Sequence, residues 1–98
     1  MNMNFAKDGE KLTIALSGRL DTTTAPSLEE KISTEISGTK ELIFDLSDLE
    51  YISSAGLRVL LSAQKAMNKL GTMTVRGANE SILEIFEVTG FVDILNIQ

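Results

Sequence analysis

Apolar and polar residues alternate near the start of the chain, and this alternation predicts a β-hairpin. Residues 3–8 and 11–17 form two short runs separated by Gly9, which suits a tight turn. The second run alternates between apolar side chains and polar or small ones, its apolar members being Leu12, Ile14 and Leu16. We therefore expect two antiparallel strands with one buried face.

A four-residue spacing of apolar residues then predicts a helix over residues 25–37. Leu28, Ile32 and Ile36 form one narrow apolar stripe. Pro26 falls in the first turn, where its missing N–H is tolerated, and Gly38 follows the last turn. A stripe this narrow indicates a helix that lies on one face of a sheet.

Two strand–helix pairs complete the pattern. A compact apolar run over residues 41–46 predicts a buried strand, and residues 47–52 are expected to form a short acidic loop. A helix over residues 55–70 would end at Gly71 and place five residues on one apolar face: Gly56, Leu60, Ala63, Met67 and Leu70.

A strand is expected over residues 72–76, followed by a helix that Asn79 caps and Gly90 ends. The inward stripe of that helix is Ile82, Ile85, Phe86 and Thr89. Residues 91–97 are too apolar for a free tail, so we expect them to pack back on the domain, for which a short strand is one solution.

The predicted order of elements is β-β-α-β-α-β-α over a single domain of residues 1–98. Strand–helix–strand crossovers connect parallel neighbours along a right-handed path. The predicted fold class is therefore α/β, with a mixed sheet made from a hairpin and later parallel crossovers. The helices are expected mainly on one face of that sheet.

Composition excludes several classes of function. The 98 residues include no Cys and no His, which removes disulfides, thiolate metal sites and the commonest general base. A net charge of −5 argues against nucleic acid or an anionic membrane surface as the direct partner. No apolar run approaches the roughly 18 residues of a membrane span, and no signal peptide is recognised at the N-terminus, so a cytoplasmic location is expected.

Ser53 and Ser54 lie at the predicted start of the helix over residues 55–70, and two interpretations follow. In the first, one hydroxyl caps the helix, which is a common role for Ser and the one that spacing alone favours. In the second, an exposed hydroxyl lies among free N–H groups at the positive end of the helix dipole. A phosphate added there would be held by backbone donors.

Two segments resemble the STAS domain family, and in particular the bacterial anti-sigma factor antagonists. The first is Asp45-Leu46-Ser47 followed by Ser53-Ser54-Ala55-Gly56-Leu57. The second is Leu16-Ser17-Gly18-Arg19-Leu20-Asp21 followed by Thr24-Ala25-Pro26. The resemblance extends from about Phe5 to Leu95. One departure is that Ser53 takes the place of the family's usual Asp.

The resemblance implies a switch between protein partners. By position, Ser54 matches the serine that a partner kinase phosphorylates, and Ser53 is the alternative. The unmodified protein would bind an anti-sigma factor serine kinase and free the sigma factor, and a phosphatase would reverse the modification. Independently of the resemblance, polar side chains after two strands are expected to form an acidic edge with this serine pair: Asp21 after one strand, and Asp45, Ser47 and Asp48 after the other. The expected partner-binding residues are Asp21, Asp45, Ser53, Ser54, Gly56, Leu57 and Arg58.

The sequence argues against an enzyme and a metal site, and it leaves one alternative to the switch. A serine nucleophile lacks a His to activate it and the Gly-x-Ser-x-Gly pattern, so no catalytic residue and no enzyme activity are expected. A metal site of Asp21, Asp45 and Asp48 lacks ligand-loop spacing, and no metal or cofactor is expected. The remaining alternative is a STAS module that does not switch: a transporter-ATPase accessory subunit, a scaffold component or a small-ligand sensor.

Overall fold

The computed structural model describes residues 1–98, and its elements follow the predicted order. The strands are β1 (Asn2–Asp8), β2 (Lys11–Leu20), β3 (Glu41–Ile52) and β4 (Thr72–Arg76). The helices are α1 (Ala25–Glu35), α2 (Ser54–Leu70) and α3 (Glu80–Val88), and a 3₁₀ turn η1 spans Phe91–Asp93.

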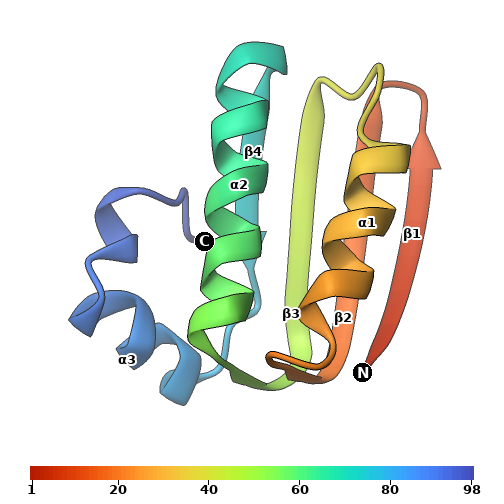
Figure 1. The fold of residues 1–98 in the computed structure, drawn as a ribbon. Coiled ribbons are helices and arrows are strands. Elements are labelled where there is room, and N and C mark those ends of the chain that lie inside the picture. Colours follow the sequence, from red (N-terminus) through yellow and green to blue (C-terminus); the bar gives the residue numbers. More distant parts are fainter.

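The four strands form one mixed sheet in the order β1-β2-β3-β4. β1 pairs with β2 antiparallel, whereas β2–β3 and β3–β4 are parallel pairs joined through α1 and α2. α1 and α2 lie side by side on one face of the sheet, and α3 lies beyond α2 (Figure 1). The predicted fold class, with helices mainly on one face, is confirmed.

The hydrophobic core lies between the sheet and these helices. The expected strand alternation is present: Leu12, Ile14 and Leu16 are no more than 1% exposed. The predicted helix stripes supply the other side of the core with Leu28, Ile32, Leu60, Ala63, Met67, Ile82 and Phe86. Two stripe residues were predicted wrongly. Leu70 is 37% exposed because α2 ends there, and Thr89 is the exposed C-cap of α3.

The acidic loop predicted over residues 47–52 is wrong, because β3 continues through this segment to Ile52. β2 also runs on to Leu20, and the two strands remain paired. β3 carries one extra residue between the pairs Ala15–Asp45 and Ser17–Asp48, and another between Gly18–Leu49 and Arg19–Tyr51. Each bulge shifts the buried face by one residue, so the buried residues of this segment recur every third position: Leu46, Leu49 and Ile52.

The C-terminal segment packs back on the domain, as expected. Leu95 is 5% exposed, and Ile97 forms a parallel β-bridge to Val75 at the outer edge of β4. The Val75 N–H donates to the Asn96 carbonyl at 2.9 Å, and the Gln98 N–H donates to the Val75 carbonyl at 2.8 Å. This bridge covers part of the edge that the five-residue strand β4 leaves open.

Candidate functional site

The ends of β2 and β3 bring the two resembling segments together. Leu20 and Ile52 are register partners, and the Ser53 N–H donates to the Leu20 carbonyl at 2.9 Å. Asp21 directly follows the last residue of β2, and Ser53 directly follows the last residue of β3. We call Asp21, Ser53 and Ser54 the serine edge. α1 and α2 both begin at this edge, at the lower end of the sheet in Figure 1.

Ser53 and Ser54 have different roles at the start of α2. Ser53 is the N-cap: its backbone is extended, and its Oγ accepts a long hydrogen bond of 3.4 Å from the Gly56 N–H. Ser54 is the first helical residue and is exposed, and its hydroxyl forms no hydrogen bond within the chain. No acidic residue lies in the first turn of α2. Ser54 is therefore an accessible hydroxyl at the positive end of a 17-residue helix.

Asp21 organises the turn that leads into α1. Its Oδ1 accepts hydrogen bonds from the Thr23 hydroxyl at 2.7 Å and the Thr23 N–H at 3.0 Å. These bonds, with further donors from Thr24, hold the pKa of Asp21 below its ordinary value of 3.8. The carboxylate is thus ionised and already engaged with its own turn beside the serine pair.

Asp45 lies elsewhere, which corrects the predicted acidic edge. The register partner of Asp45 on the unbulged strand β2 is Ala15, which lies six residues before Asp21, so this carboxylate lies roughly 20 Å along the sheet from the serine edge at about 3.3 Å per residue. Its register partner is Arg76 at the end of β4, with which it forms an ion pair of 3.6 Å. Ser47 and Asp48 accompany Asp45 in the bulged segment. No three acidic side chains are grouped so that they could hold a metal ion.

Asp45 stabilises the first bulge of β3. Its Oδ1 accepts from the Ser47 hydroxyl at 2.6 Å and from the Ser47 N–H at 3.0 Å. The Ser47 hydroxyl, the Ser47 N–H and the nearby Arg76 together lower the pKa of Asp45 from 3.8. Since the folded state favours the charged carboxylate, this contribution to stability is present above the unfolded pKa and is lost as pH falls through the lower folded pKa.

We therefore expect Asp45→Asn to destabilise the protein in a pH-dependent way. At pH 7 the variant should lose about 1 kcal/mol, the usual difference between hydrogen bonds to charged and to neutral acceptors. The difference from the wild type should shrink below pH 3.8 and approach zero once Asp45 is protonated. Urea unfolding of the wild type and of Asp45→Asn from pH 2 to pH 7 measures this difference in the free energy of unfolding. A difference that stays constant with pH would contradict the role of the Asp45 charge.

The next residues of α2 divide between packing and surface. Gly56 is buried, and a Cβ there would lie 2.7 Å from Leu20 Cγ and 2.8 Å from Ile52 Cγ1, so the glycine lets α2 approach the strand ends. Leu57 is only 7% exposed and belongs to the core. Arg58 is exposed, and at i+4 it lies on the same side of the helix as Ser54. Of these three residues, only Arg58 offers a side chain to a partner.

One surface pair near the serine edge was not predicted from sequence. The guanidinium of Arg19 lies 4.3 Å from the centre of the Tyr51 ring, and Arg19 also lies 3.8 Å from Asp21. Tyr51 is 38% exposed. Arg19 and Tyr51 are register partners only because of the second bulge, so the only signal would have been the pairing register of two strands distant in sequence.

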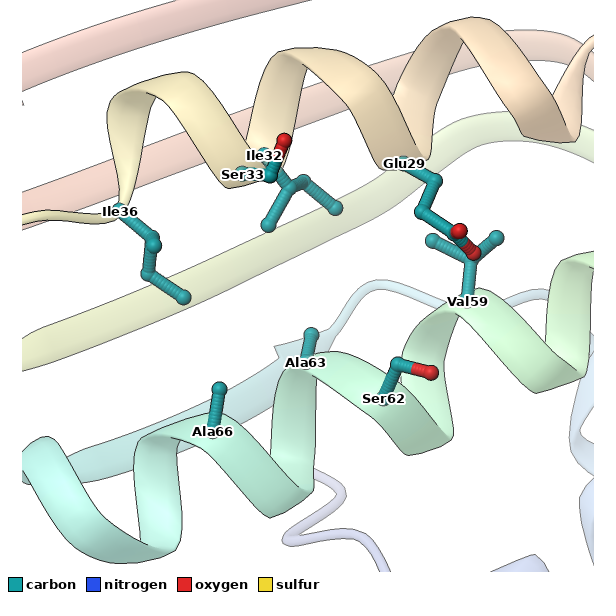
Figure 2. A pocket seen from close by; sticks show the side chains of 8 residues that line it. All are labelled: Glu29, Ile32, Ser33, Ile36, Val59, Ser62, Ala63 and Ala66. Atoms are coloured by element: carbon teal, nitrogen blue, oxygen red, sulfur yellow. The ribbon is translucent and has the colours of Figure 1, made fainter.

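A groove of about 250 Å³ runs between α1 and α2. Figure 2 shows Ile32 and Ile36 of α1 pointing toward Ala63 and Ala66 of α2. The remaining lining residues are Glu29, Ser33, Val59 and Ser62. A neighbouring hollow shares Glu29 and Val59 and is also lined by Thr22, Ala25, Pro26, Ala55 and Arg58. The two hollows therefore form one valley that begins beside the serine edge.

The chain is similar to known proteins over nearly its whole length. The family model described as STAS domain matches residues 2–98. The anti-sigma-B factor antagonist of Listeria monocytogenes is 30% identical over 96 residues, which cover 94% of this chain and 82% of the relative. The anti-sigma-B factor antagonist of Bacillus subtilis is 26% identical over 98 residues, which cover 99% of this chain and 90% of the relative.

Solved structures of the antagonist SpoIIAA share the fold. Its unphosphorylated form has a TM-score of 0.80 at 18% identity, covering 99% of this chain and 87% of that one. The phosphorylated form of the Bacillus protein has a TM-score of 0.79 at 19% identity, covering 99% and 91%. None of the helices combines the length and the hydrophobicity of a membrane span.

Proposed function

The chain belongs to the STAS domain family, and from this premise we propose that it is an anti-sigma factor antagonist that phosphorylation of Ser54 switches off. In this proposal the unmodified protein binds an anti-sigma factor that is also a serine kinase, and the sigma factor is released. Curated relatives carry the name anti-sigma-B factor antagonist, and SpoIIAA has been solved in unphosphorylated and phosphorylated forms. The observation that carries the proposal is the exposed, uncommitted hydroxyl of Ser54 at the start of α2.

The geometry favours Ser54 over Ser53 as the phosphorylated residue. The Ser53 hydroxyl accepts from the Gly56 N–H, and Ser53 is half-buried between the strand end and the helix. Phosphorylation of Ser53 would replace a helix cap, whereas phosphorylation of Ser54 would leave that cap in place. A kinase also needs the reacting hydroxyl to be accessible, which the exposed position of Ser54 supplies.

Charge alone is sufficient for the switch. A phosphoserine carries a charge near −2. A partner carboxylate about 6 Å away would be repelled by roughly 0.7 kcal/mol per unit charge in water and about 3 kcal/mol at a protein-surface dielectric. A few such contacts would prevent binding without a change of fold. Within this chain the phosphate would lie beside the helix N–H groups and one turn from Arg58, which would hold it in place.

The other proposed partner-binding residues act mostly by positioning this edge. Asp21 fixes the turn next to Ser53, and Gly56 and Leu57 fix α2 against the strand ends. Asp45 shapes the bulge of β3 and contributes to a partner surface only if that surface extends along the strand. Arg58 and the Arg19–Tyr51 pair provide exposed side chains near the serine.

Incubation with the partner kinase tests the proposal directly. Each serine-kinase anti-sigma factor of the source organism is purified and mixed with the protein and ATP, and the intact mass is followed. We expect one added phosphate on the wild type, none on Ser54→Ala, and one on Ser53→Ala. The cognate phosphatase should remove it. Modification of Ser53 in place of Ser54 would contradict the assigned position.

A non-switching STAS interaction module is the second candidate. The observation that favours it is Ser53, which stands where the family usually has an Asp beside the phosphorylated serine. In that case none of the kinases would modify the protein, although one could still bind it. Binding without a mass change, at equal affinity with and without ATP, would support the module and contradict the switch.

A further inference from the structure

The valley between α1 and α2 contains a groove that could bind an apolar side chain. Its floor is apolar, from Ile32, Ile36, Val59, Ala63 and Ala66. Two alanines on α2 face isoleucines on α1, so the facing side chains are too short to fill the space between the helices (Figure 2). The resulting groove of about 250 Å³ is open to solvent on the helix-covered face of the domain.

The carboxylate of Glu29 at the edge of the groove indicates what kind of group could bind there. Glu29 extends toward Val59 at the mouth of the groove and also lines the neighbouring hollow (Figure 2). The ion pairs of the chain use Asp21, Glu35 and Asp45, so no cation of the chain pairs with Glu29. Arg58 of α2 lines the same hollow as Glu29, but the two side chains form no ion pair. An apolar group that covered the groove would remove water from this carboxylate, which is unfavourable unless the occupant brings a positive charge.

The position of the valley indicates which molecule would supply the apolar side chain and the positive charge. The hollow next to the groove is lined by Thr22, Ala55 and Arg58, which adjoin Asp21 and Ser54 of the serine edge. A protein bound at Ser54 would therefore lie over the start of the valley. We propose that the anti-sigma factor places an apolar side chain in the α1–α2 groove and pairs an adjacent lysine or arginine with Glu29. This inference rests on the proposed function and extends its binding surface along the helices.

The wild-type complex provides the first test. Amide signals of ¹⁵N-labelled protein are followed while the purified anti-sigma factor is added. Signals at the far end of the groove, Ile36 and Ala66, should shift together with those of Ser54. Shifts confined to the serine edge would overturn the inference. The inference would also be overturned if a small apolar cation copurified in the groove and stayed bound in the complex, because the anti-sigma factor would then not fill the groove.

Two variants with matched controls provide the second test. Ala66→Leu should fill the groove and weaken binding about tenfold or more, and Lys65→Leu, one residue away on the exposed face of α2, should bind within about twofold of the wild type. Glu29→Lys should weaken binding by a similar factor, with Glu30→Lys as its control. Glu29→Gln should also reduce the salt dependence of binding. Thermal unfolding checks that every variant is folded.

The outcomes separate this inference from the proposed function. If Ala66→Leu and Glu29→Lys bind like the wild type while phosphorylation of Ser54 still prevents binding, the groove has no role and the switch stands. If the wild type binds none of the anti-sigma factors, both proposals fail. Loss of binding in the two groove variants, with the controls unaffected, supports the groove as part of the interface.

Discussion

Protein phosphorylated at Ser54 is expected to bind its anti-sigma factor about 10²–10³-fold more weakly than unmodified protein, a difference of about 3–4 kcal/mol. The reason is local, because the added dianion stands on an exposed helix start that a partner would have to cover. Calorimetric titration of the two forms against the same partner measures the ratio. Equal affinities would contradict the electrostatic switch.

Ser54→Asp should show a graded version of the same effect. It adds one negative charge instead of two, so we expect binding to weaken about tenfold. Although Ser54→Asp should weaken binding, it should stabilise the fold by about 0.3–1 kcal/mol, because an acidic residue in the first turn interacts favourably with the helix dipole. Ser81→Asp is the matched control, since Ser81 is an exposed residue in the first turn of α3. It should bind normally, and a loss as large as that of Ser54→Asp would point to net charge as the cause.

Phe44→Ala should destabilise the domain by about 3–5 kcal/mol. Phe44 lies in the middle of β3 between β2 and β4, is 0% exposed and is among the largest side chains of the core. Its removal would leave a cavity that the surrounding strands and helices cannot close. For a domain of this size the loss corresponds to a fall in Tm of about 15–30 °C. Urea unfolding followed by circular dichroism measures the free energy.

The control for Phe44→Ala is the same substitution at the edge of the sheet. Phe5 of β1 is half-buried, and Lys31 Nζ lies 5.6 Å from the centre of its ring. Solvent can enter the space that Phe5→Ala leaves, so less than half of the Phe44→Ala effect is expected. Similar losses at both positions would mean that Phe44 does not dominate the packing of the central strand.

The fold was largely predictable because most elements bury a face with a simple period. Leu12, Ile14 and Leu16 alternate, and Leu28 and Ile32 recur every four residues, so these patterns place a hairpin and a helix correctly. Asn79 was also predicted correctly, since its Oδ1 accepts from the Ile82 N–H at 2.9 Å. In such segments local pattern and tertiary packing favour the same structure.

The second half of β3 was not predictable for a definite reason. Its two bulges change the spacing of buried residues from two to three, as in Leu46, Leu49 and Ile52, and neither a strand nor a helix template matches that spacing. The error carried over to the site, because it placed Asp45 at the strand end beside Ser54. The serine pair itself was predicted as a helix start, and the assignment of the cap to Ser53 required the structure.

The α1–α2 groove also has no signal in the sequence. Ala63 was predicted as part of an apolar helix face, and pattern alone does not distinguish an alanine that fills a core from one that leaves space. The distance between α1 and α2 is set by how each helix lies on the sheet. Such distances are properties of the assembled layers and carry no local signal.

The bridge between Ile97 and Val75 has a consequence for self-association. A short, open parallel strand such as β4 offers unpaired backbone groups to any other chain, and natural sheets avoid continuous growth by blocking such edges. Here Asn96 and Gln98 occupy the N–H and the carbonyl of Val75, the fourth residue of β4. A second copy that added a strand beside β4 would have to displace this bridge, whereas β1 is the edge strand at the other end of the sheet. Edge-to-edge pairing of two copies is therefore favoured through β1, and a pair joined β1 to β1 has no second free edge of that kind from which to continue.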